Sequence, residues 1–382
     1  MSTTAFIAAR RLGIVLACAA AAIFTAGCAA PGNTTTTANA SAPSFHVDAS
    51  WPQPLPNRWI LGQVSGVAVD ADDHIWVLQR PRSLSEDEAG AAAKPPPSKC
   101  CLPAPPVLEF DTAGRLLRSW GGPGAGYDWP GNEHGIHVDA KGFVWITGNG
   151  DNDGQLLKFT REGKFVMQIG KVGPQTSNAD TTRLGKAAGV EVDAAANEVY
   201  VADGYQNRRV IVFDADTGAY KRHWGAYGRP PSDAIKPEGR RTLPPTQAQL
   251  QQFGTPVHCA RVARDGLVYV CDRLNNRVQV FNKDGSFVKE FMVEPATAGN
   301  GAVWDMVLSR DPQQRWLFMA DGRNNQVLTL ERSPGAVVST LGRPGRYAGE
   351  FHWVHDLAID SHGNLYAGEV DTGKRVQRFT RD

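Results

Sequence analysis

The sequence lacks an excess of charge of either sign. Its 382 residues carry 40 Lys and Arg against 39 Asp and Glu, a formal net charge of +1. Proteins that bind the nucleic-acid backbone through electrostatics need a basic balance or a basic patch. The composition therefore offers no electrostatic case for a nucleic-acid partner. Its 42% hydrophobic and 21% charged residues suit a globular core.

A long apolar run is also missing, because the N-terminal run from Leu12 to Phe24 has only 13 residues. That length is too short to cross a bilayer and is typical of a signal-peptide core, and Arg10 and Arg11 precede it. The run ends in Thr25-Ala26-Gly27-Cys28, which resembles a bacterial lipoprotein box. We expect residues 1–27 to be a lipoprotein-type signal peptide.

Cleavage at this box makes Cys28 the lipidated N-terminus. The next residue is Ala29 and not Asp, which in a Gram-negative cell favours the outer membrane. We therefore expect an exported lipoprotein on the periplasmic side of the outer membrane, with the lipid as its only membrane contact. An ordinary secreted protein that is cleaved nearby is the alternative. Residues 28–44 are then a flexible tether, and residues 45–382 remain for the folded domain.

Cysteine is scarce, with six residues in the whole chain. Export permits disulfides, and Cys259 and Cys271 stand on consecutive expected strands of one repeat unit, so they can pair. Spacing alone does not prove that pairing. Cys100 and Cys101 are adjacent in a Pro-rich segment, where a bridge or two free thiols are favoured over a metal role.

The chain contains an internal repeat of six units. Six units share an apolar strand, a turn that often contains Asp and Gly, a second strand, a polar hairpin and a third strand. The units are 64–121, 134–170, 188–225, 258–293, 304–342 and 355–382. Repeats of about 40–50 residues with several strands each indicate a β-propeller. We predict an all-β, six-bladed β-propeller whose units resemble NHL-type repeats.

The last unit ends after its third strand, so we expect residues 45–49 to supply its outer strand and fasten the ring. Two insertions interrupt the rhythm: residues 81–106 within the first unit and residues 226–254 between the third and fourth. Loops of this length inside a compact domain are usually functional or mobile. If these insertions emerge on the face of the ring that carries the histidines, they lie near the rim of the site. The sequence does not settle on which face they emerge.

Three histidines, His134, His258 and His355, open the first strand of alternate units. The intervening units carry Ser65, Ala188 and Trp304 at that position. In a closed ring of six blades, alternate positions lie about 120° apart around the axis. Three imidazole ligands with a fourth position left open are typical of a catalytic Zn²⁺ site. A single histidine at a strand start is more often structural, but three at symmetry-related positions predict a metal centre.

His137 lies three residues after His134. Because successive side chains of a strand alternate between its two sides, His137 faces away from the position of His134. We therefore do not expect His137 to be a metal ligand.

Four longer motifs lie in or overlap the repeat units: Leu61-Gly-Gln-Val-Ser-Gly-Val-Ala68, Asp203-Gly-Tyr-Gln-Asn-Arg-Arg-Val210, Cys271-Asp-Arg-Leu-Asn-Asn276 and Val354-His-Asp-Leu357. They resemble motifs of the peptidyl-α-hydroxyglycine α-amidating lyases, zinc propellers that split a carbinolamide into a peptide amide and glyoxylate. The resemblance runs over most of the region from Trp59 to Phe379. It implies that His134, His258 and His355 are the zinc ligands.

The resemblance also implies roles for Tyr205, Arg80 and Arg273. Tyr205 falls at the position of the catalytic tyrosine, which acts as the general base. Arg80 and Arg273 fall at two active-site arginines, one of which binds the substrate carboxylate, and their roles are interchangeable at this stage. A salt bridge that lines the channel is the alternative for each arginine. A phenol with a pKa of about 10 is a poor base at neutral pH, so a nearby cation must favour the phenolate.

A structural Ca²⁺ on the axis is implied as well. Its ligands would be the carboxylate of Asp356 and the carbonyls of Val67 and Ile136, an oxygen set that suits a hard cation. A hydrogen bond from Asp356 to a neighbouring strand is the alternative. Trp353 stands where the family usually has Met and borders the substrate pocket. Gln206 replaces a disulfide cysteine of the animal enzymes, so these differences bear on substrate specificity.

We therefore expect a monomeric, exported zinc lyase that acts on a small molecule or peptide with a C-terminal α-hydroxyglycine. One alternative is a lactonase-like, metal-dependent propeller hydrolase. That class uses axial carboxylates and Asn around Ca²⁺, which a histidine-rich axis fits poorly. The other alternative is a non-catalytic NHL-type module that binds proteins or glycans at the cell envelope.

Overall fold

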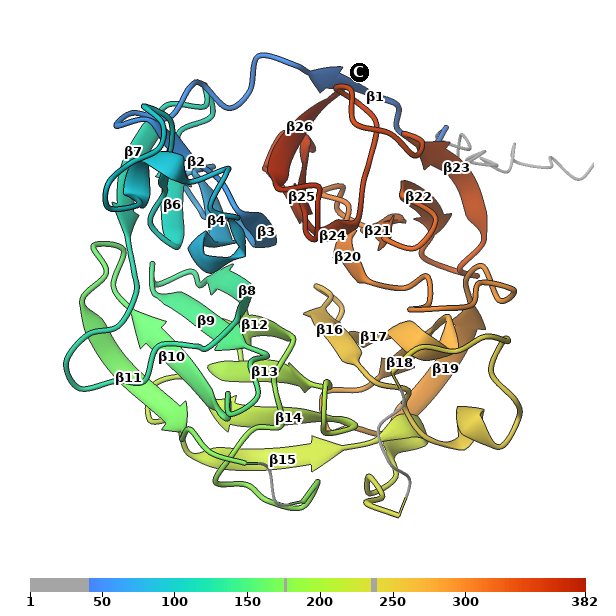
Figure 1. Ribbon diagram of the computed structural model, residues 1–382. Helices are drawn as coiled ribbons and strands as arrows, with labels where there is room; N and C mark the ends of the chain where they lie inside the picture. The colour runs from blue at the N-terminus through green and yellow to red at the C-terminus, as the bar shows by residue number, and fades with distance from the viewer. Residues whose placement is uncertain (1–40, 175–176, 235–238) are drawn as a thin grey trace, which may run out of the picture. The chain divides into compact units, whose positions relative to one another are not determined.

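The computed structural model describes residues 41–174, 177–234 and 239–382, of which residues 42–382 form one compact unit. In this unit, six four-stranded antiparallel sheets surround a central axis as the blades of a propeller (Figure 1). The predicted all-β, six-bladed fold is confirmed. The expected signal peptide, Cys28 and most of the expected tether lie outside the described residues.

Each blade runs from an inner strand at the axis to an outer strand at the rim. Blade one contains, in this order, β3 (Gln63–Val69), β4 (Ile75–Arg80), β6 (Val107–Phe110) and β7 (Leu116–Trp120). Blade two contains β8 (Glu133–Val138), β9 (Val144–Gly148), β10 (Gln155–Phe159) and β11 (Phe165–Gly170). Blade three contains β12 (Gly189–Asp193), β13 (Glu198–Asp203), β14 (Arg209–Asp214) and β15 (Tyr220–Trp224).

The second half of the ring repeats this order. Blade four contains β16 (Val257–Val262), β17 (Val268–Asp272), β18 (Arg277–Phe281) and β19 (Phe287–Met292). Blade five contains β20 (Asp305–Leu308), β21 (Trp316–Asp321), β22 (Gln326–Glu331) and β23 (Val337–Leu341). Blade six contains β24 (Val354–Ile359), β25 (Leu365–Glu369), β26 (Arg375–Arg381) and β1 (Phe45–Asp48). Across the described residues, no helix is long and apolar enough to span a membrane.

The first strand of every blade lies nearest the axis (Figure 1). Each of these six strands contacts the inner strands of the two neighbouring blades. Apolar side chains of adjacent blades pack face to face, as Val278 and Val280 of blade four do with Met306 and Met319 of blade five. Burying one such side chain contributes about 1.5–3 kcal/mol, so the stability of the ring resides largely between the blades.

The N-terminal strand closes the ring, as predicted. β1 pairs antiparallel with β26, with Phe45 opposite Arg381 and Val47 opposite Phe379. Just after this strand, the buried Trp51 lies between blades one and six. Its ring centroid is 5.8 Å from that of Phe110 and 5.1 Å from that of Tyr366. The first and last parts of the chain are thereby held in one sheet and one core.

The first insertion is anchored at both of its ends. Its strand β5 (Leu102–Pro103) pairs in parallel with β2 (Trp59–Ile60). Near its start, Glu88 forms a 2.6 Å ion pair with Lys374 of blade six. The vicinal Cys100 and Cys101 of this insertion are bonded to each other.

Candidate metal centre

Three inner strands place the three predicted histidines around the axis. His134, His258 and His355 are the second residues of β8, β16 and β24, and each is only 2–3% exposed. Their ring centroids lie 4.8–5.0 Å apart, and the candidate ligand nitrogens all lie within 4.8 Å of one another. The structure therefore brings the three side chains together, as the repeat positions predicted.

A hydrogen bond from each ring fixes which nitrogen faces the axis. The Nδ1–H of His134 donates to the carbonyl of Ala188 at 3.0 Å, and that of His355 donates to the carbonyl of Ser65 at 2.9 Å. The Nδ1–H of His258 donates to the carbonyl of Trp304. These acceptors belong to the residues at the equivalent position of the next blade. With Nδ1 protonated, Nε2 is the free ligand atom, which is the arrangement of metal-binding histidines.

Interruptions of the sheet register make room for these rings. The ladder between the first two strands is shifted beside His134, His258 and His355. A β-bulge bends the strand and redirects a side chain, and such bulges are common next to active sites. The three histidines are therefore turned toward the axis instead of alternating with their neighbours along the strand.

The three imidazoles are neutral at physiological pH. Burial lowers the pKa of His134 well below its usual value, and the nearby His355 and Arg80 lower it further. Burial is also the main cause that lowers the pKa of His258, and the charges of His355 and His134 lower it further. Burial also dominates the lowered pKa of His355. Because a metal needs the neutral imidazole, this environment favours coordination over protonation.

Tyr205 reaches the same point from the hairpin between β13 and β14. Its hydroxyl lies 2.8 Å from Nε2 of His134 and 3.2 Å from Nε2 of His258. The base of the hairpin is held by the buried ion pair between Asp203 and Arg209, at 2.8 Å. The phenol oxygen is thereby placed beside the nitrogens that would hold the metal.

Arg273 approaches from the equivalent hairpin of blade four. One of its guanidinium nitrogens donates to the Tyr205 hydroxyl at 3.2 Å, and Nε donates to the carbonyl of Asn300 at 2.9 Å. The guanidinium also stacks over Trp304, 4.0 Å from the ring centroid. Burial lowers the pKa of Arg273, and the nearby phenol of Tyr205 opposes that shift.

Arg80 ends β4 and completes the group. Its Nε donates to the carbonyl of Glu133 at 2.6 Å, and a terminal nitrogen donates to Oε1 of Gln63 at 2.8 Å. Burial lowers its pKa, against the effect of Tyr205. Among the described residues, neither Arg80 nor Arg273 forms an ion pair with a carboxylate, so the salt bridges considered as their alternative role are not observed.

These side chains share one cavity of about 250 Å³. Arg80, Tyr205, Arg273, Trp353 and His355 line it. Further lining residues, which sequence reasoning did not select, are Gln63, Asn149, Asn300, Trp304, Val370 and Asp371. Trp304 was detectable, because it occupies the repeat position of the histidines. The cavity is large enough for a small polar ligand with an attached apolar group.

Trp353 borders this cavity in an uncommon backbone conformation. Its φ is +59°, which is rare for a bulky residue, and its N–H donates to Oδ1 of Asn325 at 2.6 Å. Its carbonyl accepts from the N–H of Val370 at 3.0 Å, and its ring lies 5.5 Å from that of Trp304. The predicted position of Trp353 beside the site is therefore observed.

Both insertions reach residues next to the site. Arg82 of the first insertion forms a 3.1 Å ion pair with Glu133, the residue before His134. Arg241 of the second insertion donates to the carbonyl of Leu274, next to Arg273, at 3.1 Å. The insertions therefore follow the histidine-bearing face, which the sequence had left open.

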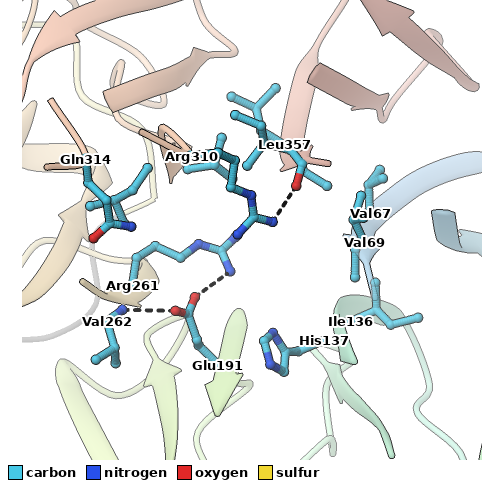
Figure 2. A pocket seen from close by; sticks show the side chains of 15 residues that line it. Val67, Val69, Ile136, His137, Glu191, Arg261, Val262, Arg310, Gln314 and Leu357 are labelled. Atoms are coloured by element: carbon cyan, nitrogen blue, oxygen red, sulfur yellow. Dashed lines mark hydrogen bonds and ion pairs between the residues drawn. The ribbon is translucent and has the colours of Figure 1, made fainter. Parts of the chain in front are cut away.

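A second hollow on the axis is lined by Val67 and Ile136, two of the three residues expected to hold calcium, and not by the third, Asp356. Val67, Ile136 and Leu357 line it, together with Arg261 and Glu191, which form a 3.3 Å ion pair (Figure 2). Figure 2 also shows His137 facing this hollow. Burial and Arg261 lower the pKa of His137 to about 4. As expected, His137 does not join the three histidines.

Asp356 fits a cation in this region. Its Oδ1 accepts a hydrogen bond from the N–H of Val67 at 3.1 Å. This is the hydrogen bond to a neighbouring strand that was the alternative role of Asp356. Burial, and then the neighbouring carboxylate of Asp305, raise the pKa of Asp356 well above its usual value. Arg261 binds Asp305 at 2.6 Å and not Asp356. Within the described chain, Asp356 forms no ion pair, although the charge of Arg261 opposes the rise of its pKa, and a bound cation would favour its carboxylate form.

Sequence reasoning missed Asp305. It follows Trp304 as Asp356 follows His355, so the repeat alignment contained the signal. An acidic residue at equivalent positions of neighbouring blades predicts two carboxylates side by side near the axis. Arg261 and Glu191 were also missed, although both stand three residues after the histidine position of their units, as His137 does in the second unit.

The chain has distant relatives over most of its length. It is 25% identical over 366 residues to mouse peptidyl-glycine alpha-amidating monooxygenase, covering 88% of the chain and 32% of that protein. The chain thus spans about a third of the length of the first curated relatives it matches. It is 21% identical over 317 residues to a probable peptidyl-alpha-hydroxyglycine alpha-amidating lyase of Caenorhabditis elegans, with 83% and 82% of the two chains covered.

Other similarities concern the repeat and the fold. The chain is 25% identical over 359 residues to mouse NHL repeat-containing protein 3, covering 88% and 84% of the two proteins. A structural genomics protein of unknown function from Bacteroides thetaiotaomicron VPI-5482 aligns with a TM-score of 0.53 at 15% identity, covering 89% and 72%. No family model matches the chain. The chain is therefore a distant relative of peptidylglycine α-amidating proteins and of NHL repeat-containing proteins.

Proposed function

We propose that the chain is a zinc-dependent lyase that cleaves a peptidyl or N-acyl α-hydroxyglycine into an amide and glyoxylate. The observation that carries this proposal is the meeting of three neutral histidines with the Tyr205 phenol, at a cavity that His355, Tyr205 and two arginines without carboxylate partners line. The similarity to a probable α-amidating lyase, over 83% of the chain, supports it.

His134, His258 and His355 would hold the zinc through Nε2, since Nδ1 of each is engaged with a carbonyl. Zinc bound by three protein nitrogens keeps an open position and, when bound, supplies a Lewis acid to a substrate oxygen. The Tyr205 oxygen lies 2.8 Å from Nε2 of His134, one of the nitrogens that would hold the zinc.

Tyr205 would act as the general base. Its phenolate takes the proton of the substrate hydroxyl, the C–O bond becomes the carbonyl of glyoxylate, and the C–N bond breaks with its electron pair on nitrogen. The amide nitrogen then receives the proton that Tyr205 holds, so the reaction is redox-neutral. Arg273 donates a 3.2 Å hydrogen bond to the Tyr205 oxygen, so a cationic donor lies at the atom that would take the proton.

The two arginines would bind the carboxylate of the substrate. A planar guanidinium forms paired hydrogen bonds with a carboxylate, and Arg80 and Arg273 each retain donors that no described carboxylate uses. Arg273 already contacts Tyr205, so Arg80 is the better candidate for the carboxylate alone. The apolar ring of Trp353 would then face the acyl or peptide portion.

Asp356, with the carbonyls of Val67 and Ile136, would hold a structural Ca²⁺ beside the second hollow. The contact between the Asp356 carboxylate and the backbone of Val67, together with the lack of an ion pair to Asp356, supports this assignment. Export through the signal peptide and a lipid anchor at Cys28 also belong to the proposal. Mass spectrometry of the mature N-terminus tests the anchor, and an unmodified Cys28 would refute it.

The decisive experiment combines metal analysis with an assay for glyoxylate. The purified chain should contain about one zinc and release glyoxylate from an N-acyl α-hydroxyglycine, and a chelator should abolish the release. His258→Ala should lose most of the zinc, whereas His223→Ala, a histidine on the outer strand β15, should keep it. A zinc-loaded chain that forms no glyoxylate would refute the lyase.

A non-catalytic module is the second candidate, because NHL repeat-containing protein 3 matches the chain over 84% of that protein. The metal analysis separates the two functions. Absence of stoichiometric zinc from the purified wild-type protein would favour the module. A hydrolase of the lactonase type is disfavoured by the three histidines on the axis.

A further inference from the structure

The bulge that presents His134 in blade two is held by a threonine. His134 and Gly135 both stand opposite Thr147, because the register between β8 and β9 shifts there. The N–H of Gly135 donates to Oγ1 of Thr147 at 2.9 Å. The Thr147 hydroxyl donates to the carbonyl of Ala188 at 2.8 Å, and this carbonyl also accepts from Nδ1 of His134. One hydroxyl thus restrains both the bulge and the acceptor of the ligand ring.

The bulge that presents His258 in blade four has the same register but a different restraint. His258 and Cys259 both stand opposite Cys271, where the register between β16 and β17 shifts. Cys259 and Cys271 are joined by a disulfide, and both are buried. Cys259 therefore occupies the position of Gly135 and Cys271 that of Thr147. The covalent bond stands where blade two has a hydrogen bond.

The disulfide also lies between two parts of the site. Cys259 directly follows His258, and Cys271 lies two residues before Arg273 on the next strand. A bulge interrupts the ladder hydrogen bonds, so the backbone there depends on other restraints. Groups that orient a metal ligand without touching the metal typically change its affinity 10–100-fold.

We propose that the Cys259–Cys271 disulfide is a positioning device for the metal centre. It holds the bulge of blade four so that Nε2 of His258 stays on the axis and Arg273 stays at the cavity. Thr147 holds the bulge of blade two in the corresponding way and so positions His134. This inference rests on the proposed metal site, and it adds that complete assembly of that site requires the oxidised form of this cysteine pair.

Two double variants without the disulfide test the proposal. Cys259→Ala with Cys271→Ala removes the bond and offers nothing in its place. Cys259→Gly with Cys271→Thr removes the bond equally but introduces the glycine and threonine of blade two. Zinc affinity is measured by competition with a chromophoric chelator, and the melting temperature of the metal-free protein is measured in parallel.

We expect both double variants to melt at a lower temperature than the wild type, because both lose the cross-link. The alanine pair should bind zinc roughly 10-fold more weakly or worse. The glycine–threonine pair should recover most of the affinity, since its hydroxyl can accept from the N–H of residue 259. A purely structural role would move the melting temperature and leave the zinc affinity of both variants unchanged.

Thr147→Val keeps the disulfide intact and tests the matching restraint in blade two; if the alanine pair does not fold, the zinc affinity of the glycine–threonine pair decides the matter. Thr147→Val should weaken zinc binding several-fold, on the order of the effect of other orienting groups. Wild-type affinity in both Thr147→Val and the alanine pair would overturn the proposal, as would a glycine–threonine pair as weak as the alanine pair. Failure of the wild type itself to bind zinc would instead refute the proposed metal site.

Discussion

At the metal centre, each histidine has one ring nitrogen engaged with a backbone carbonyl of the next blade and the other facing the axis. Burial lowers the pKa of each ring and keeps it neutral, and the bulges turn the rings inward. The Tyr205 hydroxyl lies within hydrogen-bond distance of two of these free nitrogens. Single residues therefore supply the candidate ligand atoms, and their hydrogen bonds supply the orientation.

Tyr205→Phe should abolish most of the glyoxylate release while leaving the zinc in place. The variant keeps the ring and removes the proposed base, whose contribution is typically about 100- to 10,000-fold in rate. The measurement is kcat for glyoxylate release together with the zinc content. Retention of wild-type activity in the zinc-loaded variant would show that another group takes the proton.

His137 should make the stability of the protein depend on pH. Its pKa is about 4 in the folded protein and about 6.5 when unfolded, so the unfolded chain binds the proton first as the pH falls. Its contribution to stability is present above pH 6.5 and is lost toward pH 4, by up to about 3 kcal/mol. Denaturant unfolding of the wild type and of His137→Gln should diverge over this range. Parallel pH profiles would contradict the prediction.

At the scale of elements, hairpins and bulges position the site. The hairpins that carry Tyr205 and Arg273 leave their strands at equivalent points of blades three and four. Buried ion pairs at their bases, Asp203 with Arg209 and Asp272 with Arg277, hold both of them. Equivalent hairpins with equivalent anchors therefore bring two side chains together at the tyrosine oxygen.

Arg209→Met should be strongly destabilising. The Arg209 side chain is fully buried and also donates to the carbonyls of Asn178 and Arg183, so its loss leaves the Asp203 carboxylate unpaired. Breaking a buried pair in this way costs about 3–5 kcal/mol. Chemical denaturation should show this loss, whereas Arg115→Met, at an exposed ion pair, should leave the stability close to that of the wild type. Equal effects of the two substitutions would contradict the role of the buried pair.

At the scale of the whole molecule, the ring is fastened by strands from its two ends. β1 completes blade six, and Phe45 packs against Phe318 of blade five at a centroid distance of 5.3 Å. Because His355 stands on blade six, the closure of the ring also determines whether the third histidine meets the other two. Closure and the metal centre are therefore linked through one blade.

Phe45→Ala combined with Val47→Ala should loosen this closure. Both side chains are partly buried against the core of blades five and six, and their truncation should cost about 2–4 kcal/mol. Thermal and denaturant unfolding measure the effect. Val337→Ala with Val338→Ala, on the exposed outer strand β23, is the matched control and should change little. Equal losses in the two pairs would show that β1 does not fasten the ring.

Much of the fold was predictable because alternation and turn residues act locally. The repeat indicated six blades, and the missing last strand of the sixth unit indicated that residues 45–49 would return to it, as β1 does. The convergence of His134, His258 and His355 followed from equivalent positions in a closed ring. The assignment of Tyr205, Arg80 and Arg273 to the site rested instead on resemblance, since the repeat does not predict the direction of a side chain on a hairpin.

The sequence by itself determined the blades, their order, the closing strand and the meeting of three histidines. The reason is that the period of the repeat, and the equivalent positions within its units, can be read directly from the chain. Only the tertiary structure decided the carbonyl partner of each ring, the reach of Tyr205, the second carboxylate of Asp305 and the disulfide beside His258. These contacts join different blades or lie within bulges. Their geometry depends on where whole sheets come to rest against each other, which no local pattern specifies.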